Sequence, residues 1–123
     1  MATTDEPHAE RRARILRLHP EVTRLFGPDR RSKYICVVLV AAHLATAVVA
    51  PTLPWAAYAL LAYAVGATLT QALFLAVHEL THDLFFESPL ANRAFALVAN
   101  WPMVVPFAAA FRGYHLDHHR AQG

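Results

Sequence analysis

Five histidines in two short clusters carry the clearest chemical signal in this 123-residue sequence. His78 and His82 lie in the stretch H-E-L-T-H, and His115, His118 and His119 lie in H-L-D-H-H. Spacings of three and four residues place side chains on one face of a helix, about one turn apart. An unperturbed imidazole has a pKa of about 6.5, so it is largely neutral at pH 7 and available to bind a metal ion. The two clusters together predict a metal site.

The identity of the metal stays open at this point, because imidazole binds Zn, Cu, Fe and Ni alike. A catalytic zinc ion takes three protein ligands, so five histidines indicate either two metal ions or a site completed elsewhere. The pattern H-E-x-x-H is also typical of zinc proteases, in which Glu79 would be the general base. In a different metal site, Glu79, Asp83 and Asp117 are candidates to accept an N–H from a ligating imidazole, or are solvated carboxylates.

Three other polar residues near these segments have simpler interpretations. His43 stands alone in an apolar stretch, which favours a packed, hydrogen-bonded interior residue over a metal ligand. Arg112 and Tyr114 precede the second cluster, and we expect them either to contact a lipid headgroup or to anchor the chain at a membrane interface.

The histidine clusters must be positioned by segments that are too apolar for a soluble domain. Hydrophobic residues make up 56% of the chain and charged residues 16%, and a run of 44 residues, Tyr34–Val77, contains no Asp, Glu, Lys or Arg. Residues 51–54, Pro-Thr-Leu-Pro, divide this run into Tyr34–Ala50, a helix of about 26 Å, and Trp55–Val77, a helix of about 35 Å. A bilayer core is about 30 Å thick. The sequence therefore predicts an integral membrane helical hairpin.

Residues 1–33 form a basic arm before the hairpin. Eight of the eleven Lys and Arg residues lie in this arm. The positive-inside rule therefore places the N-terminus in the cytoplasm, and two spans return the chain to that side at His78. We expect two short helices in the arm, the first starting near Pro7, with Ile15 and Leu18 on a narrow apolar stripe. Arginines beside such a stripe suggest an amphipathic segment on anionic headgroups, and a solvated charged arm is the alternative.

The segment before the second cluster is expected to form a further helical region. Ser88 and Pro89 resemble an N-cap followed by proline at the first helical position. The apolar stretch Ala94–Phe111 contains Pro102 and Pro106, which fits a kinked, interfacial or re-entrant helix better than a third span. The predicted fold is therefore all-α, a membrane hairpin with an N-terminal amphipathic arm and a kinked interfacial helix that carries histidine boxes.

Three stretches of the sequence together resemble a known family. The stretch DEPHAERRARILRLHPEV precedes the hairpin, HELTH follows the second span, and NWPMVVPFAAAFRGYHLDHHR contains the second cluster. In this combination the chain resembles the sphingolipid Δ4-desaturases (dihydroceramide desaturases) over essentially its whole length. The two histidine boxes are shared by the wider superfamily of membrane fatty acid desaturases and hydroxylases. The arm pattern, together with N-x-P before the second box, narrows the resemblance to the sphingolipid branch.

The resemblance implies a membrane di-iron enzyme that uses O2 and electrons, typically delivered by cytochrome b5. Such an enzyme converts dihydroceramide to ceramide at the C4–C5 bond of the sphingoid base. His78 and His82 would form the first iron-binding box, and His115, His118 and His119 the second. The implied partners are the lipid substrate, the membrane and the electron donor, with no nucleic acid. The implied location is the endoplasmic reticulum in a eukaryote or the inner membrane in a bacterium, with both boxes cytoplasmic.

That family has a third H-x-x-H-H box, after two further spans, which completes the iron shell and is not found here. Residues 34–123 are therefore expected to be a desaturase domain that is incomplete at the C-terminus and inactive by itself. A hydroxylase with the same boxes is an alternative for the parent enzyme. An intramembrane zinc protease is another, although it has no use for H-L-D-H-H and its Leu-Asp-Gly motif is missing. A small membrane hairpin with a structural metal is a non-enzymatic alternative. The sequence assigns no substrate-binding residues.

Overall fold

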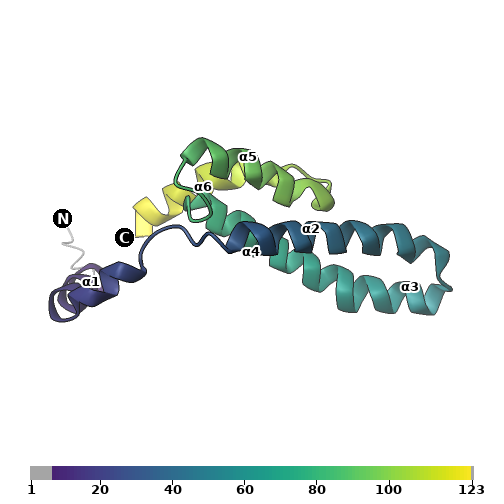
Figure 1. The fold of residues 1–123 in the computed structure, drawn as a ribbon, viewed down its shortest axis with the longest axis horizontal. Coiled ribbons are helices and arrows are strands. Elements are labelled where there is room, and N and C mark those ends of the chain that lie inside the picture. Colours follow the sequence, from purple (N-terminus) through teal and green to yellow (C-terminus); the bar gives the residue numbers. More distant parts are fainter. Residues whose placement is uncertain (1–6, 123) are drawn as a thin grey trace.

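The computed structural model describes residues 7–122, and the side chains of residues 10–119; residues 1–6 of the predicted arm lie outside this range. Within it the chain is helical with no β-strand, which confirms the predicted all-α class. Figure 1 shows a long pair of helices, with a shorter pair packed against one end and the N-terminal arm beyond that end. The elements, in chain order, are α1 Pro7–Leu18, η1 Pro20–Leu25, α2 Ser32–Val49, η2 Ala50–Thr52, α3 Trp55–Leu61, η3 Ala62–Gly66, α4 Ala67–Thr81, α5 Pro89–Asn100, η4 Trp101–Met103 and α6 Phe107–Gln122.

Two helices are long and apolar enough to cross a membrane. The first, Ser32–Thr52, has 21 residues and a mean hydropathy of 2.1, and the second, Trp55–Thr81, has 27 residues and a mean hydropathy of 1.8. The second helix joins α3, the π-helical turn η3 and α4. The two helices run antiparallel side by side (Figure 1), and only 17% of each apolar window is buried. Their outer faces are therefore the kind of surface that lipid covers.

A polar contact joins the two long helices. His43 Nε2 lies 2.9 Å from Thr70 Oγ1, and this hydroxyl donates to the carbonyl of Gly66 at 2.9 Å. Because the hydroxyl proton is used in the second bond, the Nε2–H of His43 donates in the first. His43 is thus the hydrogen-bonded residue that the sequence predicts.

The apolar core lies where α2, α4 and α5 meet. Leu73, Val77 and Leu80 on α4 are almost fully buried, together with Cys36 on α2 and Ala99 on α5. Between helices in a membrane, close van der Waals packing of such side chains stabilises the contact. This packing holds the end of α4 that carries the first histidine cluster.

The start of α5 confirms the predicted cap. Ser88 is the N-cap residue, its Oγ accepts a hydrogen bond from the N–H of Ala91 at 3.4 Å, and Pro89 is the first helical residue. The buried side chains of Ala96 and Ala99 face the core. Small residues at these positions allow α5 to pack closely on α4, which places the loop between them next to the histidines.

The loop between α4 and α5 is held by one buried amide, Asn92. Its Oδ1 accepts hydrogen bonds from the backbone N–H groups of Phe85 and Phe86, both at 3.1 Å. Its Nδ2 donates to the carbonyls of Phe86 at 2.7 Å and Ser88 at 3.0 Å. A single side chain therefore satisfies four backbone groups of a loop that has no regular structure of its own.

Pro102 and Pro106 end one helix and precede the next. The sequence predicts one kinked segment over Ala94–Phe111, whereas the structure has α5 ending at Asn100, the short turn η4, and α6 starting at Phe107. The prolines lack the N–H groups that a continuous helix needs. The chain reverses at this turn, and α6 runs back along α5 (Figure 1). The correct description is therefore two helices and a turn.

The turn between α5 and α6 is closed by Asn100. Its Nδ2 donates to the carbonyl of Val105 at 2.7 Å, and its Oδ1 accepts from the N–H of Ala108 at 2.8 Å, which caps α6. Val104, at the tip of the turn, has a φ of +64°, and the N–H of Val105 donates to the carbonyl of Met103 at 2.6 Å. This is a γ-turn, a strained conformation for a β-branched residue.

The arm forms an α-helix and a 3-10 helix, α1 and η1, so the expectation of two short helices is confirmed. Its end is tied to the loop between α4 and α5, because the N–H of Asp29 donates to the carbonyl of Leu84 at 2.9 Å and Arg30 pairs with Glu87 at 3.4 Å. Several apolar side chains of the arm are exposed, namely Ile15, Leu18, Leu25 and Phe26.

Candidate metal centre

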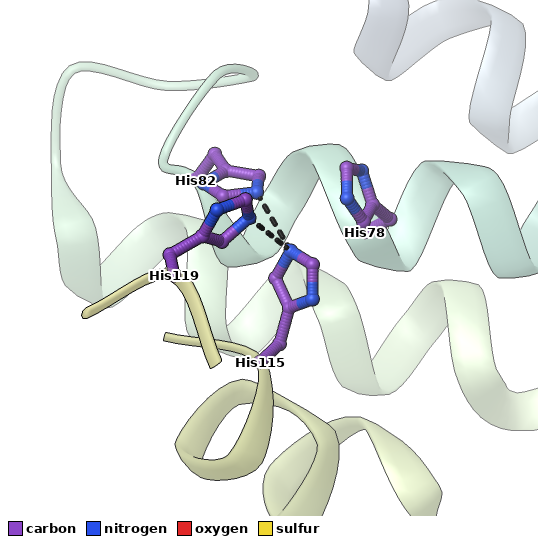
Figure 2. Close-up of side chains that lie close together, drawn as sticks. All are labelled: His78, His82, His115 and His119. Carbon is purple, nitrogen blue, oxygen red and sulfur yellow. Dashed lines mark hydrogen bonds between the residues drawn. The ribbon is translucent and has the colours of Figure 1, made fainter. Parts of the chain in front are cut away.

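Four histidines from two helices converge at one end of the hairpin (Figure 2). His78 lies in the last turn of α4, and His82 is the C-cap residue that follows this helix. His115 and His119 lie one turn apart on α6. The ligand atoms of these four residues all lie within 4.8 Å of one another. The structure thus brings together four of the five histidines that the sequence predicts as ligands.

Aromatic side chains place α6 beside α4. The ring of Phe74 on α4 lies 5.3 Å from that of Phe107 and 5.4 Å from that of Phe111, both on α6. Phe111 then stacks on His115, with ring centroids 4.9 Å apart and planes 13° apart. Such pairs contribute about 0.5–1.5 kcal/mol beyond their buried area. An apolar stack therefore leads directly into the histidine cluster.

The closest contacts in the cluster join His115 to two other histidines. Its Nε2 lies 2.9 Å from Nε2 of His82 and 3.0 Å from Nε2 of His119, the two dashed lines of Figure 2. The ring of His78 lies 4.5 Å from that of His115 and 4.8 Å from that of His82.

This arrangement suits a cation better than hydrogen bonds alone. A neutral imidazole Nε2 carries one proton or offers one lone pair, so Nε2 of His115 cannot make two good hydrogen bonds at once. Two nitrogens bound to one ion at about 2.1 Å, at right angles to each other, are about 3.0 Å apart, close to both separations in the structure. Imidazole donors fit iron among other transition metals. The residues present are therefore compatible with an iron site.

The surroundings lower the pKa of His82 and of His115. Burial is the largest cause for both side chains, and positive charge on His78 and His119 adds to it. For His82, the carboxylate of Glu79 opposes this trend. Both imidazoles therefore stay neutral to lower pH than an ordinary histidine, and neutral imidazole is the form that binds metal.

The fifth predicted ligand and the three predicted carboxylates have different surroundings. His118 is exposed, and its ring lies 6.4 Å from that of His115, so it lies beside the group of four. Glu79 Oε1 lies 2.9 Å from Nδ1 of His78, as expected for a carboxylate that orients a ligand. Asp83 instead pairs with an arginine. Asp117 lies on α6, and its orienting role stays a prediction.

The arginine that pairs with Asp83 is Arg112, a contact that the sequence reading missed. Its Nη2 donates to Asp83 Oδ2 at 3.1 Å, and its Nη1 donates to the carbonyl of Thr81. Sequence reasoning expected a headgroup or interface contact instead. One signal was present: residues 112, 115 and 119 have the spacing of one helix face, so an arginine shares the face of two predicted ligands.

A cavity of about 490 Å³ lies between α4, α5 and α6, next to this arginine. Its wall is mostly apolar, with two arginines, and includes Leu80, Thr81, Arg93, Leu97, Ala108 and Arg112. None of the four clustered histidines lines it. The cavity therefore borders Thr81 and Arg112, which lie next to the candidate metal centre, and not the clustered histidines themselves.

Comparison with known families agrees with this geometry. The family model described as "Fatty acid desaturase" matches residues 53–123, which include both histidine clusters. The chain belongs to this family. The model described as "Sphingolipid Delta4-desaturase" matches residues 2–31, the arm, which confirms the resemblance to the sphingolipid branch.

The most similar relatives include desaturases from fungi, plants and animals. The chain is 46% identical to a sphingolipid delta(4)-desaturase of Schizosaccharomyces pombe over 123 residues, 98% of this chain and 34% of the relative. It is 43% identical to one of Arabidopsis thaliana over 120 residues, 98% and 36% of the two chains. It is 38% identical to one of Drosophila melanogaster over 122 residues, 98% and 38%. The chain thus spans about a third of the length of these curated relatives. No solved structure matches it.

Proposed function

We propose that this chain supplies histidine ligands to the iron centre of a sphingolipid Δ4-desaturase. The observation that carries the proposal is the convergence of His82 and His115, whose Nε2 atoms are 2.9 Å apart although the residues are 33 positions apart in the sequence. A desaturase uses both boxes, whereas a zinc protease needs only the first. Membership of the fatty acid desaturase family and the names of the relatives support the same choice.

The proposed roles follow from the contacts. Four histidines of the cluster hold iron, and His118 is a further ligand at its edge, to a second ion. Glu79 accepts the Nδ1–H of His78, which leaves the Nε2 lone pair for a metal. Bound iron, with O2 and with electrons from a donor such as cytochrome b5, would supply the oxidising strength needed to remove two hydrogens from unactivated carbons. The substrate is dihydroceramide and the product ceramide. The proposed ligands are His78, His82, His115, His118 and His119.

The proposed setting is a membrane. Residues 34–123 form the desaturase domain, and the helices Ser32–Thr52, which begins at the end of the arm, and Trp55–Thr81 cross the bilayer as a hairpin. The α5–α6 pair lies at the interface, so the metal centre sits at the membrane edge, where a lipid can reach it. Residues 1–33 form the amphipathic arm on anionic headgroups, on the cytoplasmic side. The membrane is the endoplasmic reticulum in a eukaryote or the inner membrane in a bacterium.

The test is expression of the gene's complete open reading frame in a host that makes dihydroceramide but not ceramide. We expect lipid mass spectrometry to show a new C4–C5 double bond, and His115→Ala to abolish it. A 4-hydroxylated product instead would favour the hydroxylase alternative. Unchanged sphingolipids, from protein that is made and carries iron, would contradict the proposal. Full desaturation by His115→Ala would contradict the proposed role of the second histidine box.

A further inference from the structure

One guanidinium joins the two elements that carry the clustered histidines. Arg112, on α6, donates from Nη2 to Asp83 Oδ2 at 3.1 Å and from Nη1 to Asp83 Oδ1 at 3.4 Å. Its Nη1 also donates to the carbonyl of Thr81. The Arg112 side chain is 22% exposed and that of Asp83 32% exposed, so the pair is partly shielded from water. A planar, two-point contact of this kind sets orientation as well as distance.

The backbone at this point needs such a partner. Thr81 is the last residue of α4, and the final carbonyls of a helix have no partner within it. A cation at this end also interacts favourably with the helix dipole. Asp83 has a φ of +59°, a left-handed conformation that aspartate adopts more readily than most residues. The chain thus turns sharply after His82, with a carbonyl before it and a carboxylate after it, and Arg112 binds both.

The contacts of Arg112 therefore lie next to proposed ligands on both α4 and α6. Thr81 and Asp83 flank His82 in the sequence, and Arg112 lies one turn before His115 on the face that also carries His119. The other contacts between α4 and α6 include aromatic pairs, such as Phe74 against Phe107. Ring contacts tolerate small sliding motions, whereas three directed hydrogen bonds do not. The rings alone do not fix the 2.9 Å separation between His82 and His115.

We infer that Arg112 is a positioning residue for the metal centre. It binds the backbone and carboxylate on both sides of His82 and so holds the histidines of α6 at ligand distance from those of α4. This inference rests on the proposed function, because it assumes that the cluster binds metal. Arg112 forms no hydrogen bond with a clustered histidine within the described residues.

The experiment titrates cobalt(II) into the protein expressed from the complete open reading frame, in lipid nanodiscs, and follows visible absorption, which reports affinity and coordination geometry. Arg112→Gln should weaken cobalt binding about 10–100-fold, the usual cost of losing a group that orients ligands. It should also shift the absorption bands. Arg112→Lys keeps the positive charge but not the two-point hydrogen bonding of the guanidinium, so its cobalt affinity should lie between those of the wild type and Arg112→Gln. Circular dichroism checks that each variant keeps its helices.

Two further variants make the test specific. Asp83→Asn removes the ion pair while keeping a residue that tolerates a positive φ, and should weaken binding in the same direction. The double variant Asp83→Asn/Arg112→Gln should lose no more cobalt affinity than Arg112→Gln alone, since both changes break the same ion pair. Arg93→Gln is the matched control, because Arg93 lines the same cavity but makes no hydrogen bond or ion pair within the described residues. It should bind cobalt like the wild type.

The outcomes separate this inference from the function on which it rests. If the wild type binds cobalt and Arg112→Gln binds it with the same affinity and spectrum, Arg112 does not position the ligands and the proposed metal centre stands. The same conclusion follows if Arg93→Gln is as harmful as Arg112→Gln, because any lost arginine would then suffice. A wild-type chain that binds no cobalt contradicts the metal centre itself, and this inference with it.

Discussion

His82 and His115 are 33 residues apart in the sequence, yet their Nε2 atoms lie 2.9 Å apart in the folded chain. The first ends α4, and the second lies in the middle of α6. No local property of either segment produces this contact. It depends on the reversal at residues 101–106 and on the packing of α6 against α4, and each of the predictions below tests one part of that arrangement.

The contact predicts unequal effects of histidine substitutions on metal binding. His82→Ala or His115→Ala removes a nitrogen at the centre of the cluster and should weaken cobalt binding by this chain at least about 100-fold. His118→Ala should change the affinity for the first cobalt ion by less than about threefold, because His118 lies at the edge of the cluster and is the proposed ligand of a second ion. Isothermal titration in detergent measures each affinity, with His19→Ala in the arm as control. Equal losses for His118 and His115 would contradict the geometry.

The lowered pKa values of His82 and His115 predict a pH dependence of stability. As pH falls through about 6.5, the unfolded chain takes up protons that the folded chain resists. The metal-free protein should therefore become less stable as pH falls through this range, and the loss should level off below the lowered pKa values. Chemical unfolding in micelles at pH 7.5, 6.5 and 5.5 measures this. The His82→Gln/His115→Gln double variant should show a flatter profile; an equally steep one would show that other groups are responsible.

Asn92 should contribute strongly to stability although it is not a proposed metal ligand. Asn92→Leu keeps the branching at Cγ but leaves the N–H groups of Phe85 and Phe86 and the carbonyl of Phe86 without this partner, which should lower the free energy of unfolding by about 3 kcal/mol or more. Ser88→Ala, which removes only the cap of α5, should cost about 1 kcal/mol. Both values come from chemical unfolding in micelles followed by circular dichroism. A smaller loss for Asn92→Leu than for Ser88→Ala would show that the loop does not depend on this amide.

The γ-turn at Val104 predicts a stabilising substitution. Val104 has a φ of +64°, which glycine adopts without a steric cost, so Val104→Gly should raise the free energy of unfolding by about 1 kcal/mol. Val105→Gly is the control, because the adjacent valine has no positive φ and a glycine there only adds flexibility to the unfolded chain. Unfolding curves of the two variants should therefore shift in opposite directions. A lower free energy of unfolding in both variants would show that Val104 is not strained.

The proposed hairpin predicts on which side of the membrane each loop lies. In a Cys36→Ala background, which removes the buried native thiol, Glu87→Cys and Thr52→Cys provide one exposed thiol each. A membrane-impermeant maleimide should label the first only from the side of the N-terminal arm and the second only from the opposite side. Labelling of both positions from one side would exclude a hairpin that crosses the bilayer.

Much of the helical pattern follows from the sequence because local chemistry decides it. The charge-free run predicts both long helices, and Pro-Thr-Leu-Pro predicts the break between them. Ser88 and Pro89 predict the start of α5, since a cap acts on its own first turn. The two histidine boxes predict ligand pairs, because helical spacing alone places side chains one turn apart.

The remaining features depend on contacts between distant segments. Two prolines are compatible with a kink or with a reversal, and the side chain of Asn100, which closes the turn and caps α6, decides for the reversal. Asp83 follows a ligand and so resembles an orienting carboxylate, but α6 brings Arg112 to it. Neither outcome can be read from residues within one helical turn.

By itself the sequence determined the family, the two apolar spans and which residue types could bind metal, because composition and short-range spacing carry that information. Only the tertiary structure decided that four of the five histidines form one cluster with His118 at its edge. Only the tertiary structure showed that Arg112 binds Thr81 and Asp83 at the C-terminal end of α4. The physical reason is that ligand geometry depends on packing and directed hydrogen bonds between helices, whose partners lie about 30 residues apart.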